Sequence, residues 1–309
     1  MRYLVLCGGG IHASFEIGVL KELLTYNGSD FYYDALYGSS AGAMNCAFLS
    51  MFPKEEMKSA VLDLEQHWLN MSRTWPAPKS GIFHALQSYI CCSNAMNSLD
   101  DMGQFMDSML DFSLVGTTPL YVSSMDIRNR CCVVSRLERP SSTDRVQRLK
   151  DMERNKKLLL SSASIPFVWP SVSVSSRGGT RRVLADALTV LPIPLPKYDP
   201  EIVQYIDIIL PINTKVEKVH SSDDGVKEIG LSIAYTTFEM ATDHILEIAR
   251  LQFGNRARMY SPTSMSTVDK GFLVVNKRHI AEMIDKGSTF FCSNPQGQRA
   301  QPRKPIVYE

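Results

Sequence analysis

The stretch from residue 1 to residue 51, MRYLVLCGGGIHASFEIGVLKELLTYNGSDFYYDALYGSSAGAMNCAFLSM, decides the fold. Residues 3–7 form a short apolar run that predicts a buried strand, and the three glycines at 8–10 force a tight turn after it. Apolar residues then recur at helical spacing, and Asn27-Gly28 is a pair suited to end a helix.

A second strand and a second helix follow in the same stretch. Residues 31–37 are rich in aromatic side chains and predict a strand, whereas residues 40–51 carry apolar side chains at helical intervals. A strand-helix-strand unit gives neighbouring parallel strands with a right-handed connection. Both glycine-bearing turns are therefore expected at one edge of a sheet.

The rest of the chain extends this α/β pattern. Further helices are expected at 55–71, 145–162, 229–253 and 277–286, and further strands at 119–125, 131–137, 183–185 and 202–212. We expect one three-layer α/β/α sandwich with a mainly parallel central sheet, over residues 1–292. Within it, residues of about 75–117 suit a helical insertion or lid, and residues 293–309 suit a disordered tail.

Composition limits the classes of partner and cofactor. The 309-residue chain has a net charge of +1, which provides no global field for nucleic acid, so no nucleic-acid partner is expected. Its seven cysteines show no repeated C-x-x-C spacing, so no metal is expected, and free thiols fit a reducing compartment. With no signal-peptide pattern and no long apolar run, the sequence predicts a cytoplasmic protein.

The chemistry is indicated by Gly38-Ser39-Ser40-Ala41-Gly42, which fits the G-x-S-x-G pattern of a nucleophile between a strand and a helix. In the alternative interpretation, Ser40 merely caps a helix, which would leave the first glycine run without a role. Backbone amides of Gly8, Gly9 and Gly10 suit an oxyanion hole. A nucleotide-binding loop is the rival, but the spacing after Gly10 matches neither common phosphate-binding pattern.

The order of these elements differs from that of ordinary α/β-hydrolases, which place several strands before the elbow and a histidine late in the chain. Here the elbow follows the second strand. His220, His244 and His279 occur late enough, but they lie in helical or charged stretches and are predicted to be surface or packing residues.

The sequence resembles the patatin-like phospholipases over residues 2–193, and less closely to about residue 286. Those enzymes use a Ser-Asp dyad, and their signature is a glycine run with a following basic residue, the elbow, Ser-Ala-x-Ile-Pro and an Asp-Gly turn. The counterparts in this chain are Gly8 to Gly10 with His12, Gly38 to Gly42, Ser162-Ala163-Ser164-Ile165-Pro166, and Asp186-Ala187. The resemblance implies a dyad of Ser40 and Asp186.

Three positions depart from that signature: His12 replaces Arg or Lys, Ala13 replaces Gly, and Ala187-Leu188 follows the aspartate where glycine-rich residues are usual. Alanine resists backbone angles that glycine adopts, so a slightly different turn is expected after Asp186, and Asp126 is the alternative partner. His12 would act as an auxiliary residue, either adding positive charge near the oxyanion or, as we favour, capping the helix start.

The resemblance implies a lipid acyl hydrolase that cleaves carboxylic esters through an acyl-enzyme, with no cofactor and no metal. A lipid acyltransferase and a catalytically impaired lipid-binding protein of the same fold are the alternatives. Residues 127–157 hold ten basic and four acidic residues, which suit either an anionic lipid surface or a solvated helix face. We therefore expect a lipid substrate and a peripheral location at membranes or lipid droplets.

Overall fold

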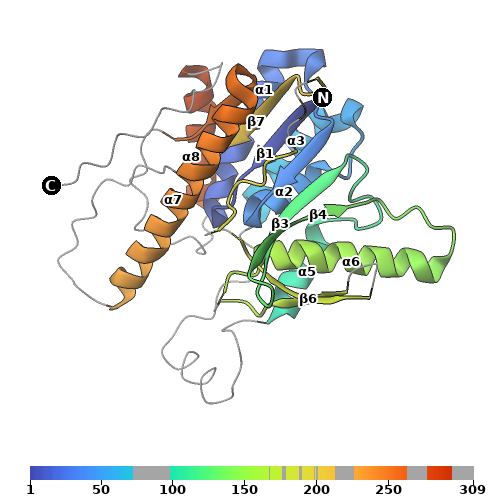
Figure 1. The fold of residues 1–309 in the computed structure, drawn as a ribbon. Coiled ribbons are helices and arrows are strands. Elements are labelled where there is room, and N and C mark those ends of the chain that lie inside the picture. Colours follow the sequence, from blue (N-terminus) through green and yellow to red (C-terminus); the bar gives the residue numbers. More distant parts are fainter. Residues whose placement is uncertain are drawn as a thin grey trace.

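The computed structural model describes residues 1–71, 98–166, 168–175, 179–187, 190–197, 199, 201–212, 226–262 and 277–293, and all statements below concern these residues. A central sheet of eight strands lies between helices (Figure 1). The strands are β1 (Arg2–Leu6), β2 (Ala35–Gly38), β3 (Leu120–Asp126), β4 (Cys131–Leu137), β5 (Val172–Ser175), β6 (Arg181–Ala185), β7 (Tyr205–Ile209) and β8 (Ala257–Tyr260).

The strand order is β5-β6-β3-β2-β1-β7-β8. β2 and β6 pair with different parts of one edge of β3, and β4 pairs with the other edge along its whole length. The pairs from β3 through β2, β1 and β7 to β8 are parallel, whereas β4 and β6 pair with β3 antiparallel, as does β5 with β6. The expected mainly parallel sheet is confirmed. The antiparallel strands β4, β5 and β6 lie together at the β3 end of the sheet.

Seven helices of the described part are α1 (Ser14–Asn27), α2 (Ser40–Leu49), α3 (Met57–Asn70), α5 (Leu99–Met109), α6 (Arg145–Ala163), α7 (Val226–Phe253) and α8 (Lys277–Ser293). A short 3-10 helix, η1 (Gly10–Ala13), precedes α1. As expected, α1 ends at Asn27, and its C-cap Gly28 has a φ of 55°, in the left-handed region that glycine tolerates.

The two faces of the sheet carry separate apolar cores, because successive side chains of a strand point to opposite faces. On one face, Leu4 and Leu6 of β1 lie in the core that includes buried side chains of α1, α2, α3, α5, α6 and α8. On the other, Val5 lies in a core with Ile245 and Ala249 of α7. The three-layer α/β/α prediction is therefore confirmed (Figure 1).

Helix α8 packs against α1 through two glycines. A Cβ on Gly18 would lie 1.9 Å from the carbonyl oxygen of Ile284, and a Cβ on Gly287 would lie 2.2 Å from that of Phe15. No side chain larger than hydrogen fits either position, so the two backbones lie in direct contact. This contact joins the last described helix to the first.

Other expectations met mixed outcomes. The strands β5 and β8 were not predicted, and β2 begins at Ala35 rather than at residue 31. Within the expected insertion of about 75–117, residues 98–117 contain α5 and turns, while residues 72–97 and the expected tail from 294 lie outside the described residues. None of the described helices has the length and apolar character needed to cross a bilayer.

Candidate active site

Ser40 lies at the junction of β2 and α2, in a strained backbone conformation. Its φ of 51° is one of only two positive values among the described non-glycine residues. The flanking glycines are required by close contacts: a Cβ on Gly38 would lie 2.4 Å from the Cα of Ala43, and one on Gly42 would lie 2.4 Å from the carbonyl oxygen of Leu6. The local geometry is that of a tight strand-to-helix elbow.

The glycine turn follows β1, the strand that pairs directly with β2, so the turn and Ser40 lie at the same sheet edge. Gly10 has a φ of 54°, and a Cβ on Gly9 would lie 2.7 Å from the side chain of Pro211. Among the hydrogen bonds between described residues, none has the amide of Gly8, Gly9 or Gly10 as donor. Successive backbone N–H groups in a turn of this kind suit the binding of an anion.

The strand pairing brings the chain around Ser40 toward Asp186. Because β4 occupies one edge of β3, β2 and β6 share the other: the last residue of β2 is in register with Val122 and the last residue of β6 with Met125. Three residues along a strand span roughly 10 Å. Ser40 and Asp186 each follow shortly after these two converging strand ends, and both are 4% exposed.

The C-terminal end of α6 contacts both residues. The backbone N–H of Ser40 donates to the hydroxyl oxygen of Ser162 at 3.1 Å, and the backbone N–H of Asp186 donates to the carbonyl oxygen of Ser164 at 2.9 Å. One short segment therefore fixes the backbone of both positions. The sequence motif indicated that this segment belongs to the family signature, but the role of the Ser162 side chain was not predicted.

Additional buried serines surround this segment. The hydroxyls of Ser124 on β3 and Ser161 on α6 lie 2.9 Å apart, and Ser161 also donates to the carbonyl of Leu158 at 2.7 Å. Buried hydroxyls need such partners, because an unsatisfied buried polar group costs free energy. The serines at 161, 162 and 164, directly after the apolar run Leu158–Leu160, were the available signal for a polar site here.

The alternative partner, Asp126, is engaged by its own hairpin turn. Its Oδ1 accepts from the backbone N–H groups of Arg128 and Asn129, both at 3.1 Å, and its Oδ2 accepts from the amide of Asn129 at 2.8 Å. Burial raises the pKa of this carboxyl, but the hydrogen bonds from Asn129 and Arg128 and the charge of Arg182 outweigh it and lower the pKa. Asp126 stabilises the β3–β4 turn.

His12 lies inside η1, whose N-cap is Gly9, rather than at a capping position. The residue is 3% exposed, and its ring centroid lies 5.3 Å from that of His279. Burial and the neighbouring His279 lower the pKa of His12 to about 4, and a hydrogen bond to Gly9 offsets only part of this. His12 is therefore neutral near pH 7, which argues against the alternative of positive charge near the oxyanion, and its place inside η1 does not match the favoured role of a cap.

The late histidines have the predicted surface and packing roles where they are described. His279 is buried against His12, and His244 is exposed on α7. His220 lies outside the described residues. The described chain also contains no cluster of three or more His, Cys, Asp or Glu side chains suited to a metal ion.

The two alanine departures impose no left-handed strain. Ala13 has a φ of −61°, which is helical, and Ala187 is not among the described residues with positive φ. The carbonyl of Ala187 accepts hydrogen bonds from the backbone N–H groups of Val190 at 2.8 Å and Leu191 at 2.7 Å. The turn after Asp186 thus forms with alanine, while Leu188 itself lies outside the described residues.

A buried polar network holds α2, the helix that follows the elbow. The side-chain amide of Asn45 on α2 donates to Glu16 at 2.8 Å and to the carbonyl of Ala13 at 3.2 Å, and its oxygen accepts from the indole of Trp68 at 2.7 Å. Burial raises the pKa of Glu16 well above its usual range. The network joins α1, α2 and α3.

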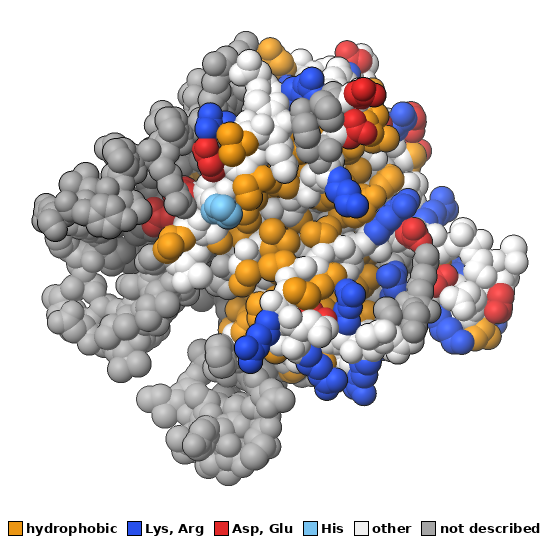
Figure 2. All heavy atoms as spheres, in the orientation of Figure 1, with side chains coloured by type: hydrophobic (Ala, Val, Ile, Leu, Met, Phe, Trp, Pro, Cys, Tyr) orange, Lys and Arg blue, Asp and Glu red, His pale blue; other side chains and the backbone are white. Residues whose placement is uncertain are grey.

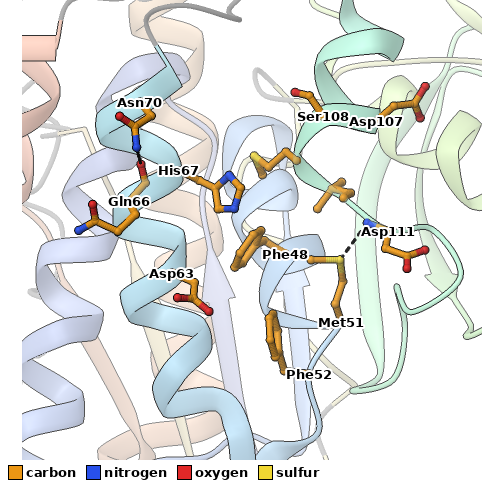
Figure 3. A pocket seen from close by; sticks show the side chains of 12 residues that line it. Phe48, Met51, Phe52, Asp63, Gln66, His67, Asn70, Asp107, Ser108 and Asp111 are labelled. Carbon is orange, nitrogen blue, oxygen red and sulfur yellow. Dashed lines mark hydrogen bonds between the residues drawn. The ribbon is translucent and has the colours of Figure 1, made fainter.

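An open pocket of about 660 Å³ lies at the other end of α2 (Figure 3). Phe48, Met51 and Phe52 form its apolar side, and His67 of α3 faces them, with its ring centroid 5.0 Å from that of Phe48. Phe48 lies eight positions after Ser40 along the helix, which is roughly 12 Å. The pocket is therefore distinct from the elbow.

Comparisons with known proteins identify the family of this chain. The family model described as "Patatin-like phospholipase" matches residues 4–196. No curated protein sequence matches the chain. Among solved structures, VipD from Legionella pneumophila is similar, with 11% identity and a TM-score of 0.38 over 94% of this chain and 66% of that chain. Because the family model covers more than half of its length, this chain belongs to the patatin-like phospholipases, a family of lipid ester hydrolases.

Proposed function

We propose that this protein hydrolyses acyl esters of glycerophospholipids or acylglycerols, with Ser40 as nucleophile and Asp186 as general base. The observation that carries the proposal is the convergence of the ends of β2 and β6 on one edge of β3, just before these two residues. The shared contact with the end of α6 supports it, because that contact restrains both backbones together.

In the proposed reaction, the carboxylate of Asp186 accepts the hydroxyl proton of Ser40 while the Ser40 oxygen attacks the ester carbonyl carbon. The carbonyl oxygen becomes an oxyanion that receives hydrogen bonds from amides of the glycine turn. The tetrahedral intermediate then collapses, and the departing alcohol takes the proton from Asp186. Water, deprotonated by Asp186, releases the fatty acid and restores Ser40.

The positive end of α2 lies at Ser40 and stabilises negative charge there, as does any helix N-terminus. Neutral His12 adds no full charge to this environment, so the proposed oxyanion hole depends on backbone amides. The alternatives of lipid acyl transfer and of lipid binding without catalysis share the fold. Lipid binding without catalysis was suggested by the alanine after Asp186, and Ala187 shows no left-handed strain.

A fluorophosphonate probe tests the nucleophile. Wild type should be labelled, and Ser40→Ala should not. Asp186→Asn should lose roughly 10⁴-fold in kcat on the best substrate of a panel of phospholipids, lysophospholipids and triacylglycerols, by analogy with other serine hydrolases. Asp126→Asn is the matched control, because it also neutralises a buried carboxylate and should retain most activity.

Two outcomes contradict the proposal. Labelling that persists in Ser40→Ala places the nucleophile elsewhere, and absence of both labelling and hydrolysis in folded wild type favours a lipid-binding protein. Equal losses in Asp126→Asn and Asp186→Asn, with circular dichroism showing both folded, would remove Asp186 from its specific role.

We also propose a cytoplasmic enzyme that reaches membranes or lipid droplets as a peripheral protein. The five described cysteines are free thiols, which is consistent with a reducing compartment. Cell fractionation with salt washes tests this: the protein should appear in the cytosol and in a salt-extractable membrane fraction, and recovery only in a secreted fraction would contradict it.

A further inference from the structure

The tip of the β3–β4 hairpin and the outer end of β6 bring four arginines together. Arg128 and Arg130 lie in the exposed turn after β3, and Arg181 and Arg182 begin β6. The two segments are adjacent, because Ile127 donates its backbone N–H to the carbonyl of Val183 at 2.9 Å. We call these four side chains, with Ile127, the arginine tip.

The positive charge of the arginine tip has little compensation within the described chain. Among the carboxylates that the structure describes, only Asp126 lies within ion-pair range, 3.9 Å from Arg182, and its two oxygens already accept hydrogen bonds from the turn. By contrast, the other basic residues of the 127–157 stretch include several in ion pairs with described carboxylates: Arg136 with Glu138, Lys156 with Asp107, and Lys157 with Glu153. Clustered like charges repel one another unless an external anion is present.

The backbone of Arg130 adds an independent indication. Its φ of 52° makes it, with Ser40, one of two described non-glycine residues in the left-handed region, where glycine or asparagine would be less strained. Such outliers cluster at functional sites. The hairpin thus retains an arginine side chain at a position where its backbone alone would favour glycine.

The arginine tip lies at the sheet edge that carries Ser40. The last residue of β2, Gly38, pairs with Val122 of β3. Because β3 continues four residues beyond Val122, the tip extends about 13 Å past the end of β2. Ile127 is 42% exposed there and supplies an apolar side chain. On the face shown in Figure 2, Lys and Arg side chains predominate below a band of hydrophobic side chains over the sheet.

We infer that the arginine tip docks the protein on an anionic phospholipid bilayer, with the Ser40 edge of the sheet turned toward the lipid. The inference rests on the proposed function, because docking would bring the enzyme to its lipid substrate. The binding experiment itself does not require catalysis. Guanidinium groups bind lipid phosphates through paired hydrogen bonds, and exposed Ile127 can enter the interface.

Vesicle co-sedimentation tests the inference in the Ser40→Ala background, so that hydrolysis does not consume the vesicles. Vesicles of phosphatidylcholine alone are compared with vesicles of 70% phosphatidylcholine and 30% phosphatidylserine. The double variant Arg128→Gln, Arg130→Gly removes two positive charges. It should weaken binding to the anionic vesicles by roughly 30-fold, at about fivefold per arginine. Arg130→Gly also relieves the left-handed strain, so loss of binding would not reflect a misfolded turn.

The matched control is Arg145→Gln with Arg148→Gln, which removes the same charge from the exposed first turns of α6. It should weaken binding less than threefold. The inference is overturned if the tip variant binds like its parent, if the control loses as much, or if pure phosphatidylcholine binds equally well. It is also overturned if the tip variant changes binding to soluble polyglutamate alone, which would indicate an acidic protein partner.

Hydrolysis of a soluble short-chain ester separates the two proposals. The tip variant with Ser40 intact should keep wild-type kcat/KM on that ester while losing activity on anionic vesicles. Vesicle binding without any ester hydrolysis in wild type would refute the proposed catalysis and leave the docking site standing.

Discussion

The glycine contact between α1 and α8 makes a sharp prediction about stability. Replacing Gly18 or Gly287 by alanine places a methyl group 1.9 Å from the carbonyl oxygen of Ile284, or 2.2 Å from that of Phe15. Carbon and oxygen atoms that are not bonded are comfortable only beyond about 3.2 Å, close to the packing distances of protein interiors. The two helices must therefore separate by roughly 1 Å in either variant.

The expected magnitude follows from two opposing effects. Overpacking of a buried contact costs about 1–3 kcal/mol, and the upper end applies because the obstructing atoms belong to the backbone. Alanine returns about 1 kcal/mol of helix propensity relative to glycine. The net loss in the free energy of unfolding is about 2 kcal/mol, which lowers Tm by roughly 4–8 °C in a domain of this size.

Gly103→Ala is the control, because Gly103 also lies inside a helix but its Cβ would meet only the flexible end of Lys156, at 3.4 Å. This variant should gain up to about 1 kcal/mol. Thermal unfolding followed by circular dichroism, with urea titration to obtain the free energy of unfolding, distinguishes the three proteins. Wild-type or higher Tm in both Gly18→Ala and Gly287→Ala would refute the direct backbone contact.

Three further predictions concern buried titratable groups. His12 has a folded-state pKa of about 4, below the usual 6.5, so its neutral form stabilises the fold above pH 6.5. The free energy of unfolding should fall by up to about 3 kcal/mol as pH drops from 6.5 toward 4. Urea titrations of His12→Gln should show no such fall. Glu16 has a raised pKa, so stability should fall as pH rises, and Glu16→Gln should gain on wild type between pH 5 and 8. Arg258→Ala leaves buried Asp207 without its bidentate partner and should cost about 3–5 kcal/mol in urea unfolding, whereas Arg250→Ala, at an exposed pair, should leave the midpoint nearly unchanged.

The features that the sequence predicted correctly are those encoded locally. Apolar runs, helical spacing and glycine turns appear within a few residues, so the first strand-helix-strand-helix unit was predicted with small errors in its boundaries. The strand β8 was missed because Arg258 interrupts its short apolar run. That arginine is accommodated by Asp207, 51 residues earlier in the chain, and no local pattern shows such a pairing.

The residues of the candidate site could be named from the sequence, but the contacts that position them could not. The elbow and the Asp186 motif are readable as short patterns, whereas the antiparallel approach of β6 along β3 depends on pairing between distant segments. The role of His12 was also beyond the sequence, because its low pKa results from burial against His279 on the last described helix. Tertiary contacts decide both cases.

The strained elbow at Ser40 needs an external restraint, and α6 supplies one. A non-glycine residue in the left-handed region costs about 1–3 kcal/mol, so an unrestrained Ser40 would relax toward ordinary helical angles. The hydrogen bond from its N–H to Ser162 recovers about 1 kcal/mol, and the tight contacts at Gly38 and Gly42 oppose the remaining relaxation. Because the same helix end also binds the backbone of Asp186, a movement of α6 would displace both residues of the proposed dyad together. Their relative geometry is therefore less sensitive to such a movement than the position of either residue alone.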